Sequence, residues 1–199
     1  MSRTAKISRK TKETNIAISV NLDGVGDGAG SYKIKTGLFF FDHMLEQLSH
    51  HSGIDMEIDA KGDLAIDSHH TVEDVAITLA SAIKEAIGNK KGINRFGFAY
   101  IPMDEALTRV VVDLSGRPYT VFKCNFTVDK IGDVDSEMFR EFFIAFANNL
   151  GCNLHIENLY GINNHHIIES CFKGLAKAIK TAIAIRDNSN NLASTKGLL

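Results

Sequence analysis

A segment that occurs twice constrains the fold of this chain more than any other feature of its sequence. The run SHHTVEDVAITLASAIKEAI at 68–87 aligns with NHHIIESCFKGLAKAIKTAI at 164–183, at an offset of 96 residues. The matching apolar positions follow the i, i+3, i+4, i+7 spacing of a helix that buries one face. We therefore expect one long amphipathic helix in each half, with Ser68 and Asn164 as the N-caps.

The repeat continues upstream with a two-residue gap, because FDHMLEQLSHHSGIDMEI at 41–58 aligns with FREFFIAFANNLGCNLHI at 139–156. Gene duplication explains this match and predicts two half-domains, 1–92 and 93–199, that pack with approximate two-fold symmetry. Hydrophobic periodicity predicts helices and strands in the order strand–strand–helix–strand–helix, with an extra strand opening the second copy. The expected helices are 40–50, 68–87, 137–149 and 164–185, and the expected strands are 14–23, 32–37, 55–63, 99–104, 107–114, 119–126 and 153–157.

Strands 14–23 and 32–37 are predicted to form a hairpin around the glycine-rich segment 24–30. No helical pattern follows these glycines, so a plain turn is favoured over a phosphate-binding loop. The three cysteines are odd in number and form no C-x-x-C pair, so a disulfide framework is not expected, and Cys171 falls on the apolar helix face.

The bulk composition excludes several classes of protein. The 22 Lys and Arg against 24 Asp and Glu give a formal net charge of −2, with no basic footprint for nucleic acid. No apolar run approaches the ~18 residues of a membrane-spanning helix. The N-terminal residues lack the apolar stretch of a signal peptide, which predicts a cytoplasmic protein.

Each long helix begins with the motif H-H-x-x-E. At ~100° per residue the glutamate is flanked by both imidazoles, beside the apolar face, whereas the two adjacent histidines point apart. One metal ion can rarely take both, so each helix should serve two metal sites. His43 and Glu141 occupy equivalent positions on the preceding helices, and the candidate ligands become His43, His69, His70, Glu73, Glu141, His165, His166 and Glu169.

Mixed imidazole and carboxylate ligands favour Mn or Fe over a structural Zn site. Solvated helix N-termini are the alternative, and the occurrence of two motifs at matching repeat positions favours metal. His155 lies in an expected strand and is interpreted as structural. For His51, which falls on the side of His43, a substrate contact and a structural role both stay open.

The chain resembles the imidazoleglycerol-phosphate dehydratase family along essentially its whole length. The matching segments are TKET (11–14), FFDHMLEQLSHHSG (40–53), DSHHTVEDV (67–75), INRFG (93–97), PMDEALTRVVVDLSGRP (102–118), EFF (141–143), NNHHIIESCFKGLA (163–176) and STKG (194–197). The resemblance implies an α/β (α+β two-layer) fold, with mixed four-stranded sheets and helices in each ribosomal protein S5 domain 2-like half. It also implies two Mn²⁺ ions per active site and self-association into trimers and a twenty-four-subunit assembly.

The resemblance places metal ligands on the same eight residues, although position 141 is often histidine in the family. Segment 186–193 departs from the proline-containing pattern expected before STKG. Without the resemblance, Lys196 would be interpreted as a solvated tail residue. The implied substrate contacts are Glu13, His43, Gln47, His51, Arg95, Arg117, Lys173, Ser194, Thr195 and Lys196.

The implied reaction removes water from D-erythro-imidazole glycerol phosphate and gives imidazole acetol phosphate, a step of histidine biosynthesis. The proton to be lost sits on a carbon without a neighbouring carbonyl, so base catalysis alone would fail. We hypothesise that manganese favours the deprotonated form of the substrate imidazole, which expels the hydroxyl. A glutamate then removes the proton, and Glu13, Glu73 and Glu169 are all candidates. The cationic side chains in the substrate set would neutralise the phosphate.

Two other functions stay open at this point. A dimetal hydrolase would cleave a phosphate ester, and an RNA-binding module is suggested by the S5-like fold alone and disfavoured by the net charge. We also expect the active site to be shared between subunits. If the halves pack back to back, the two ligand trios need not meet within one chain, and a complete metal shell would then need a helix of each half from different subunits. The alternative is that both ligand trios converge within one chain.

Overall fold

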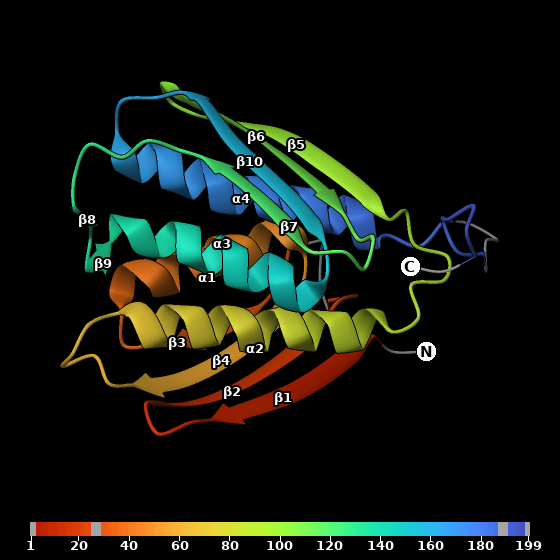
Figure 1. The fold of residues 1–199 in the computed structure, drawn as a ribbon, viewed down its shortest axis with the longest axis horizontal. Helices are drawn as coiled ribbons and strands as arrows, with labels where there is room; N and C mark the ends of the chain where they lie inside the picture. The colour runs from red at the N-terminus through yellow and green to blue at the C-terminus, as the bar shows by residue number, and fades with distance from the viewer. Residues whose placement is uncertain (1–2, 25–28, 187–190, 198–199) are drawn as a thin grey trace.

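Two four-stranded sheets enclose four helices in the computed structural model, which describes residues 3–24, 29–186 and 191–197 (Figure 1). The first sheet has the order β1-β2-β4-β3, with β1 (Thr4–Lys10), β2 (Thr14–Asn21), β3 (Tyr32–Lys35) and β4 (Asp55–Gly62). The second has the order β5-β6-β10-β7, with β5 (Phe96–Met103), β6 (Ala106–Asp113), β7 (Tyr119–Lys123) and β10 (Asn153–Tyr160). Both sheets are mixed, because β3 runs parallel to β4 and β7 runs parallel to β10. The matching strand orders express the sequence repeat in three dimensions and confirm the expected fold class.

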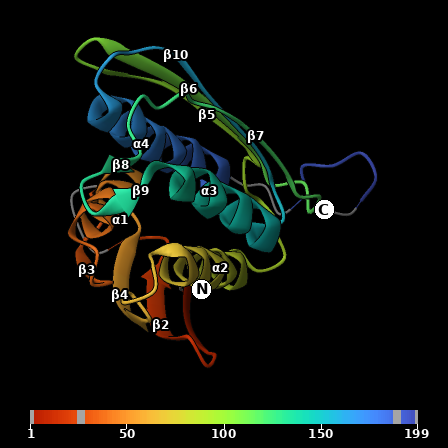
Figure 2. The same cartoon turned by 60° about the vertical axis from the view of Figure 1, so that its left-hand side comes forward.

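The helices of the two halves pack against each other between the sheets (Figures 1 and 2). They are α1 (Phe39–Ser52), α2 (His69–Ile87), α3 (Ser136–Leu150) and α4 (Asn164–Ile183). Helix α1 packs on α4, and α2 packs on α3, so each shorter helix contacts the long helix of the other half. The buried side chains form one continuous core across both halves. The division at residues 92 and 93 stays a prediction.

Aromatic side chains fix the position of α3 against α4. The Phe142 ring lies 5.0 Å from the Phe172 ring and 5.3 Å from the Phe143 ring, and all three are fully buried. Burial of one such side chain stabilises the fold by about 1.5–3 kcal/mol. The apolar face of the second H-H-x-x-E helix is therefore anchored, which holds the polar start of that helix in place.

The first half differs from its prediction in its strands. The expected hairpin of 14–23 with 32–37 is wrong, because β2 pairs with β1 and β4 while β3 pairs with β4. Strand β1 was missed, since in TAKISRK only Ala5 is buried and charged residues separate its few apolar ones. With β1 included, the extra strand opens both copies. Of the predicted turn at 24–30, residues 25–28 lie outside the described residues.

Smaller corrections concern helix ends and one short hairpin. The N-cap of α4 is Asn163, whose side chain accepts hydrogen bonds from the backbone N–H groups of His165 and His166. The Asn164 side chain bonds instead to Thr127, and Ser68 makes no side-chain cap bond. The strand predicted at 119–126 ends earlier, and an unpredicted hairpin of β8 (Lys130–Ile131) and β9 (Val134–Asp135) precedes α3.

No described helix has the length and apolar character needed to cross a membrane. Cys124, Cys152 and Cys171 are free thiols, and Cys171 is buried, as its place on the apolar helix face predicted.

Candidate active site

Three of the predicted ligands converge where α1 packs on α4. His43 comes from α1, and His165 and Glu169 come from the first turns of α4. Glu169 Oε2 lies 2.7 Å from His165 Nε2 and 3.3 Å from His43 Nε2. One ligand atom from each residue lies within 4.8 Å of the others, a spacing that a single metal ion could bridge. We call these residues the first ligand set.

Glu169 is ionised although it is buried. Its side chain is 6% exposed, so Glu169 lies in the buried face of α4. The sequence had predicted a position beside that face, which is wrong for this residue. Burial raises the pKa of Glu169, but hydrogen bonds from Lys173 and His165 lower it more, and the pKa lies below its ordinary value. Lys173 Nζ is 2.6 Å from Glu169 Oε1. The first ligand set therefore presents two imidazoles and one carboxylate, which suits Mn²⁺ or Fe²⁺.

His51 lies on the same side of α1 as His43, near this set. Its pKa is lowered by burial first and then by the charges of Lys173 and Lys177. A neutral imidazole here can both donate and accept a hydrogen bond. Gln47, one turn earlier, is half-buried. His155 is exposed on the outer face of β10, away from the helices, and its structural role stays a prediction.

The equivalent residues of α2 and α3 are not gathered in the same way. We call His69, Glu73 and Glu141 the second ligand set, because the repeat relates them to the first. Glu141 accepts a hydrogen bond from Arg140 at 3.0 Å, and its side chain is 36% exposed. Within the described residues, no second group of three ligand-type side chains lies as close together as the first.

His70 and His166 also stay outside the first ligand set. His70 Nδ1 lies 3.0 Å from Asp63 Oδ2, and His166 Nδ1 lies 2.7 Å from Glu105 Oε2. The pKa of each histidine is raised, chiefly by this hydrogen bond, and Glu13 contributes to the shift at His70. Asp63 and Glu105 were not predicted as site residues, because neither lies in a repeated motif.

A second polar region lies at the far end of α4. Arg95, Arg117, Ser194, Thr195 and Lys196 line a cavity of about 500 Å³ together with Ser115 and Gly116. All five of the first-named residues were predicted substrate contacts. Three cationic side chains and three hydroxyl groups around one cavity suit an anion such as a phosphate.

Arg95 is held firmly in this cavity. Its guanidinium donates to both oxygens of Asp113, at 2.7 and 3.1 Å, and to the backbone oxygen of Ala193 at 2.7 Å. The last of these bonds ties the C-terminal segment to the start of β5. Arg95 also adopts a left-handed backbone conformation, with φ of 76°, a strained geometry that is common at binding sites.

The two regions are far apart within one chain. The backbone N–H of Arg95 donates to the Ala182 oxygen, near the C-terminus of α4. Glu169 lies thirteen residues before Ala182 on the same helix, which separates them by about 20 Å. Figure 1 shows the start of α4 and the C-terminal segment at opposite ends of the molecule.

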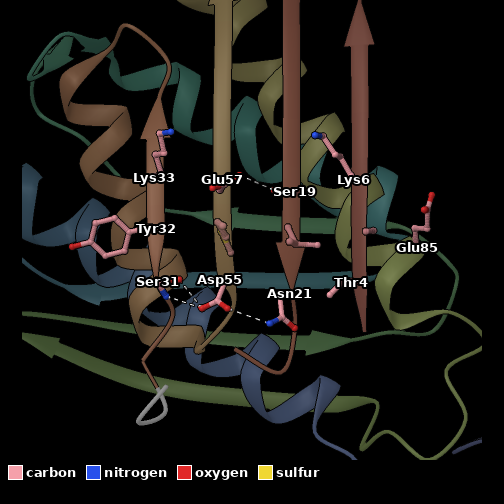
Figure 3. Close-up of a pocket in the computed structure, with 13 residues that line it drawn as sticks. Thr4, Lys6, Ser19, Asn21, Ser31, Tyr32, Lys33, Asp55, Glu57 and Glu85 are labelled. Atoms are coloured by element: carbon pink, nitrogen blue, oxygen red, sulfur yellow. Dashed lines mark hydrogen bonds between the residues drawn. The ribbon is translucent and has the colours of Figure 1, made fainter. Parts of the chain in front are cut away.

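A larger cavity contains none of the predicted residues. It measures about 710 Å³ and lies on the outer face of the first sheet (Figure 3). Lys6, Ser19, Glu57 and Lys33 form a mixed-charge row across it, one residue from each strand. No histidine lines this cavity, so its chemistry differs from that of the first ligand set.

Comparison with known proteins identifies the family. Residues 36–179 match the family model described as imidazoleglycerol-phosphate dehydratase. The imidazoleglycerol-phosphate dehydratase of Rhodopseudomonas palustris strain BisB5 is 57% identical over 99% of this chain and 98% of its own length. The chain belongs to the imidazoleglycerol-phosphate dehydratase family. It is therefore an enzyme, a carbon–oxygen lyase of the hydro-lyase class.

Other members of the family agree in sequence and in fold. The dehydratase of Azorhizobium caulinodans is 54% identical over 99% of this chain and 98% of its own length. A crystal structure of the dehydratase from Staphylococcus aureus superposes with a TM-score of 0.82 at 37% identity, over 92% of this chain and 99% of that one. The corresponding structure from Pyrococcus furiosus gives 0.83 at 37% identity, over 97% and 100%.

Proposed function

We propose that this chain converts D-erythro-imidazole glycerol phosphate to imidazole acetol phosphate and water in histidine biosynthesis, with two Mn²⁺ ions in each active site. Family membership over the whole chain is the observation that carries the reaction. The convergence of His43, His165 and Glu169 supports the metal, since ligand-type groups from two halves meet at one point.

The two ligand sets would each hold one ion. The first set offers two imidazole nitrogens and a carboxylate kept ionised by Lys173. In the second set, Glu141 would release its ion pair with Arg140 and bind the metal ion instead. A bound Mn²⁺ would supply a Lewis acid that favours loss of the ring proton of the substrate imidazole. His51, neutral beside the first set, can orient the substrate by hydrogen bonding.

Glu13 is the candidate base that the geometry favours. The Glu169 oxygens are engaged by Lys173, His165 and His43. Glu73 belongs to the second ligand set. Glu13 is exposed in the turn between β1 and β2, near enough to His70 to raise its pKa, and within the described residues its carboxylate makes no hydrogen bond. A free carboxylate beside a metal ligand can accept the proton that the substrate carbon loses.

The active site must be shared between subunits if the cavity at Arg95 binds the substrate phosphate. Imidazole and phosphate of this substrate are joined through about seven bonds, so they are at most ~10 Å apart. The first ligand set and Arg95 are about 20 Å apart along α4. One substrate can therefore reach both chemistries only when they come from different chains.

The outer face of the second sheet supports self-association, in the trimers and twenty-four-subunit assembly that we expect. Phe98, Tyr100 and Tyr119 are 69%, 53% and 64% exposed there. An apolar patch of this kind is costly to leave in water and is typical of a protein interface. The face of the first sheet is charged by comparison. Cytoplasmic location stays a prediction.

A turnover assay tests the proposed reaction. Purified protein stripped with a chelator should be inactive on imidazole glycerol phosphate, and Mn²⁺ should restore formation of the ketone product. Release of inorganic phosphate without ketone would instead favour the dimetal hydrolase. Full turnover by the metal-free protein would exclude the proposed role of manganese.

Lys196→Ala tests the cavity at Arg95. Lys196 is exposed and lies beside Ser194 and Thr195, so its loss should raise KM for the phosphate-bearing substrate roughly tenfold and leave the Mn²⁺ content unchanged. Lys91→Ala, a change at an exposed lysine outside the cavity, is the control. Unchanged KM and kcat in Lys196→Ala would mean that Lys196 is a solvated tail residue without a role in substrate binding.

A further inference from the structure

Two histidines of the duplicated motif are held by carboxylates that the proposed chemistry does not use. Asp63 Oδ2 lies 3.0 Å from His70 Nδ1, and Glu105 Oε2 lies 2.7 Å from His166 Nδ1. The same ring nitrogen faces the carboxylate in both halves. Because an ionised carboxylate only accepts hydrogen bonds, Nδ1 must donate, and a neutral ring then keeps its lone pair on Nε2.

We propose that Asp63 and Glu105 are positioning residues, which fix the Nδ1–H tautomer of His70 and His166 and present each Nε2 to a manganese ion. The inference rests on the proposed function, because it assigns the two histidines to the metal. Carboxylates behind metal-bound histidines commonly set the ring orientation and increase its strength as a ligand.

Glu105 is itself held rigidly. Its Oε1 accepts hydrogen bonds from the backbone N–H groups of Ile162, at 3.0 Å, and Asn163, at 2.7 Å. These two bonds and the one to His166 lower the pKa of Glu105 to about 2, with the Asn163 bond as the largest cause. The carboxylate is thus ionised and pinned to the segment that starts α4, so the His166 ring cannot rotate freely.

The two halves hold their histidines with residues that the repeat does not relate. Ile18 pairs with Ile58 in the first sheet, and Val110 pairs with Ile156 in the second. Ile58 and Ile156 are equivalent in the repeat, so their strand partners Ile18 and Val110 are equivalent as well. Glu13 and Glu105 each lie five residues before these partners, and they are therefore equivalent to each other. A bulge between Asn158 and Tyr160 shifts the register of β10 by one residue, so Gly161 is the equivalent of Gly62. Asp63 therefore corresponds to Ile162.

The side chain at the position equivalent to Asp63 explains why the second half cannot hold its histidine in the same way. Ile162 stands there and is 82% exposed, and its apolar side chain cannot accept a hydrogen bond from His166 Nδ1. The second half therefore holds His166 with the turn carboxylate, Glu105. In the first half Asp63 holds His70, which leaves the equivalent turn carboxylate, Glu13, unengaged for the proton transfer proposed above.

Replacing each carboxylate by its amide tests the assignment. Glu105→Gln keeps an oxygen for the two backbone N–H groups but turns an NH₂ group toward His166 Nδ1. The ring must then accept at Nδ1 and carry its proton on Nε2, which blocks metal binding. We expect the affinity of one Mn²⁺ ion, followed by electron paramagnetic resonance titration of the assembled protein, to fall about 10- to 100-fold. Asp63→Asn should weaken the other ion by a similar factor.

Asp104→Asn is the matched control for loss of charge. Asp104 Oδ2 lies 3.6 Å from Nε2 of His166, its side chain is 80% exposed, and its left-handed φ of 46° suits asparagine. This variant should change Mn²⁺ affinity less than threefold, since exposed charges interact weakly. Equal losses in Asp104→Asn and Glu105→Gln, or unchanged affinity in Glu105→Gln, would overturn the inference. Absence of Mn²⁺ binding by the wild-type protein would instead refute the manganese part of the proposed function.

Discussion

The first and second ligand sets descend from one duplicated unit, yet within one chain only the first set is gathered at one point. Glu169 is buried and held by Lys173, one turn further along α4. The equivalent of Lys173 on α2 is Ile77, and Glu73 is half-exposed without a cation at that position. Duplication has preserved the ligand types, while the neighbouring charges decide how close together the ligands lie within one chain.

The two sets also differ in charge. Two imidazoles and one carboxylate form the first set, whereas one imidazole and two carboxylates form the second, because Glu141 stands where the first half has His43. Additional carboxylates strengthen the binding of hard divalent cations. The second set is therefore expected to rely on its charge, and the first on its prior organisation.

Glu169→Gln should have the largest effect on this comparison. The change removes the only anionic ligand of the first set and leaves the Lys173 ammonium near a neutral amide. We expect loss of one Mn²⁺ per chain and a fall in kcat/KM of more than 100-fold, because loss of a ligand exceeds the effect of losing a supporting group. Metal analysis and steady-state kinetics measure both. Two ions retained in the variant would show that the first set is not a metal site.

Lys173→Met should have the next largest effect. Burial then raises the pKa of Glu169 without the opposing hydrogen bond, so protons compete with Mn²⁺ at higher pH. In the wild-type chain the lowered pKa keeps the carboxylate ionised until the pH falls below its ordinary value of 4.5. We expect the acid limb of Mn²⁺ binding to move to higher pH, with activity roughly tenfold lower near neutrality.

Ile77→Met is the matched control, since it places the same residue at the equivalent position of α2. A conservative apolar exchange of this kind should leave the pH profile unchanged and cost less than about 1.5 kcal/mol of stability. An identical shift in both variants would mean that Lys173 does not organise the first set through its charge.

Glu141→His gives the second set the composition of the first. Activity should be kept within about threefold, while Mn²⁺ affinity at this set falls several-fold through the loss of one carboxylate. Isothermal titration calorimetry of metal binding separates the two sets by their affinities. Stronger binding in the variant would contradict the idea that the second set depends on charge.

Arg140→Ala should have the smallest effect. Arg140 forms an ion pair with Glu141 and is 60% exposed, so the pair is screened by water. Its removal should tighten Mn²⁺ binding at the second set by about twofold and leave the first set unchanged. Weaker binding would show that Arg140 helps to place Glu141 for the metal.

The sequence predicted the site better than it predicted the strands. The H-H-x-x-E motifs and the position of His43 on the preceding helix are local patterns, so they identified the residues of the first ligand set. Their meeting depends on α1 packing against the long helix of the other half, which no local pattern contains. Strand β1 was missed because its charged residues obscure the alternation of apolar and polar positions. The pairing of β2 with β1 in a hairpin was missed for the same reason.

Asp63 and Glu105 escaped prediction for a different reason. They lie outside the repeated motifs, and they contact His70 and His166 only after strand register and helix packing are fixed. The repeat even suggests the wrong partner, because it relates Glu105 to Glu13 rather than to Asp63. The bulge in β10, which places Ile162 rather than Gly161 at the position of Asp63, is visible only in the folded sheet.

Mixing two inactive variants tests the shared active site most directly. His165→Ala disables the first ligand set, and Arg117→Ala disables the cavity about 20 Å away along α4. If each substrate uses a ligand set from one chain and a cavity from another, random mixed assemblies should recover up to about one quarter of wild-type activity. Native mass spectrometry must show that the subunits have exchanged. Mixed assemblies no more active than either variant alone would contradict the account, because the two regions would then have to act within one chain.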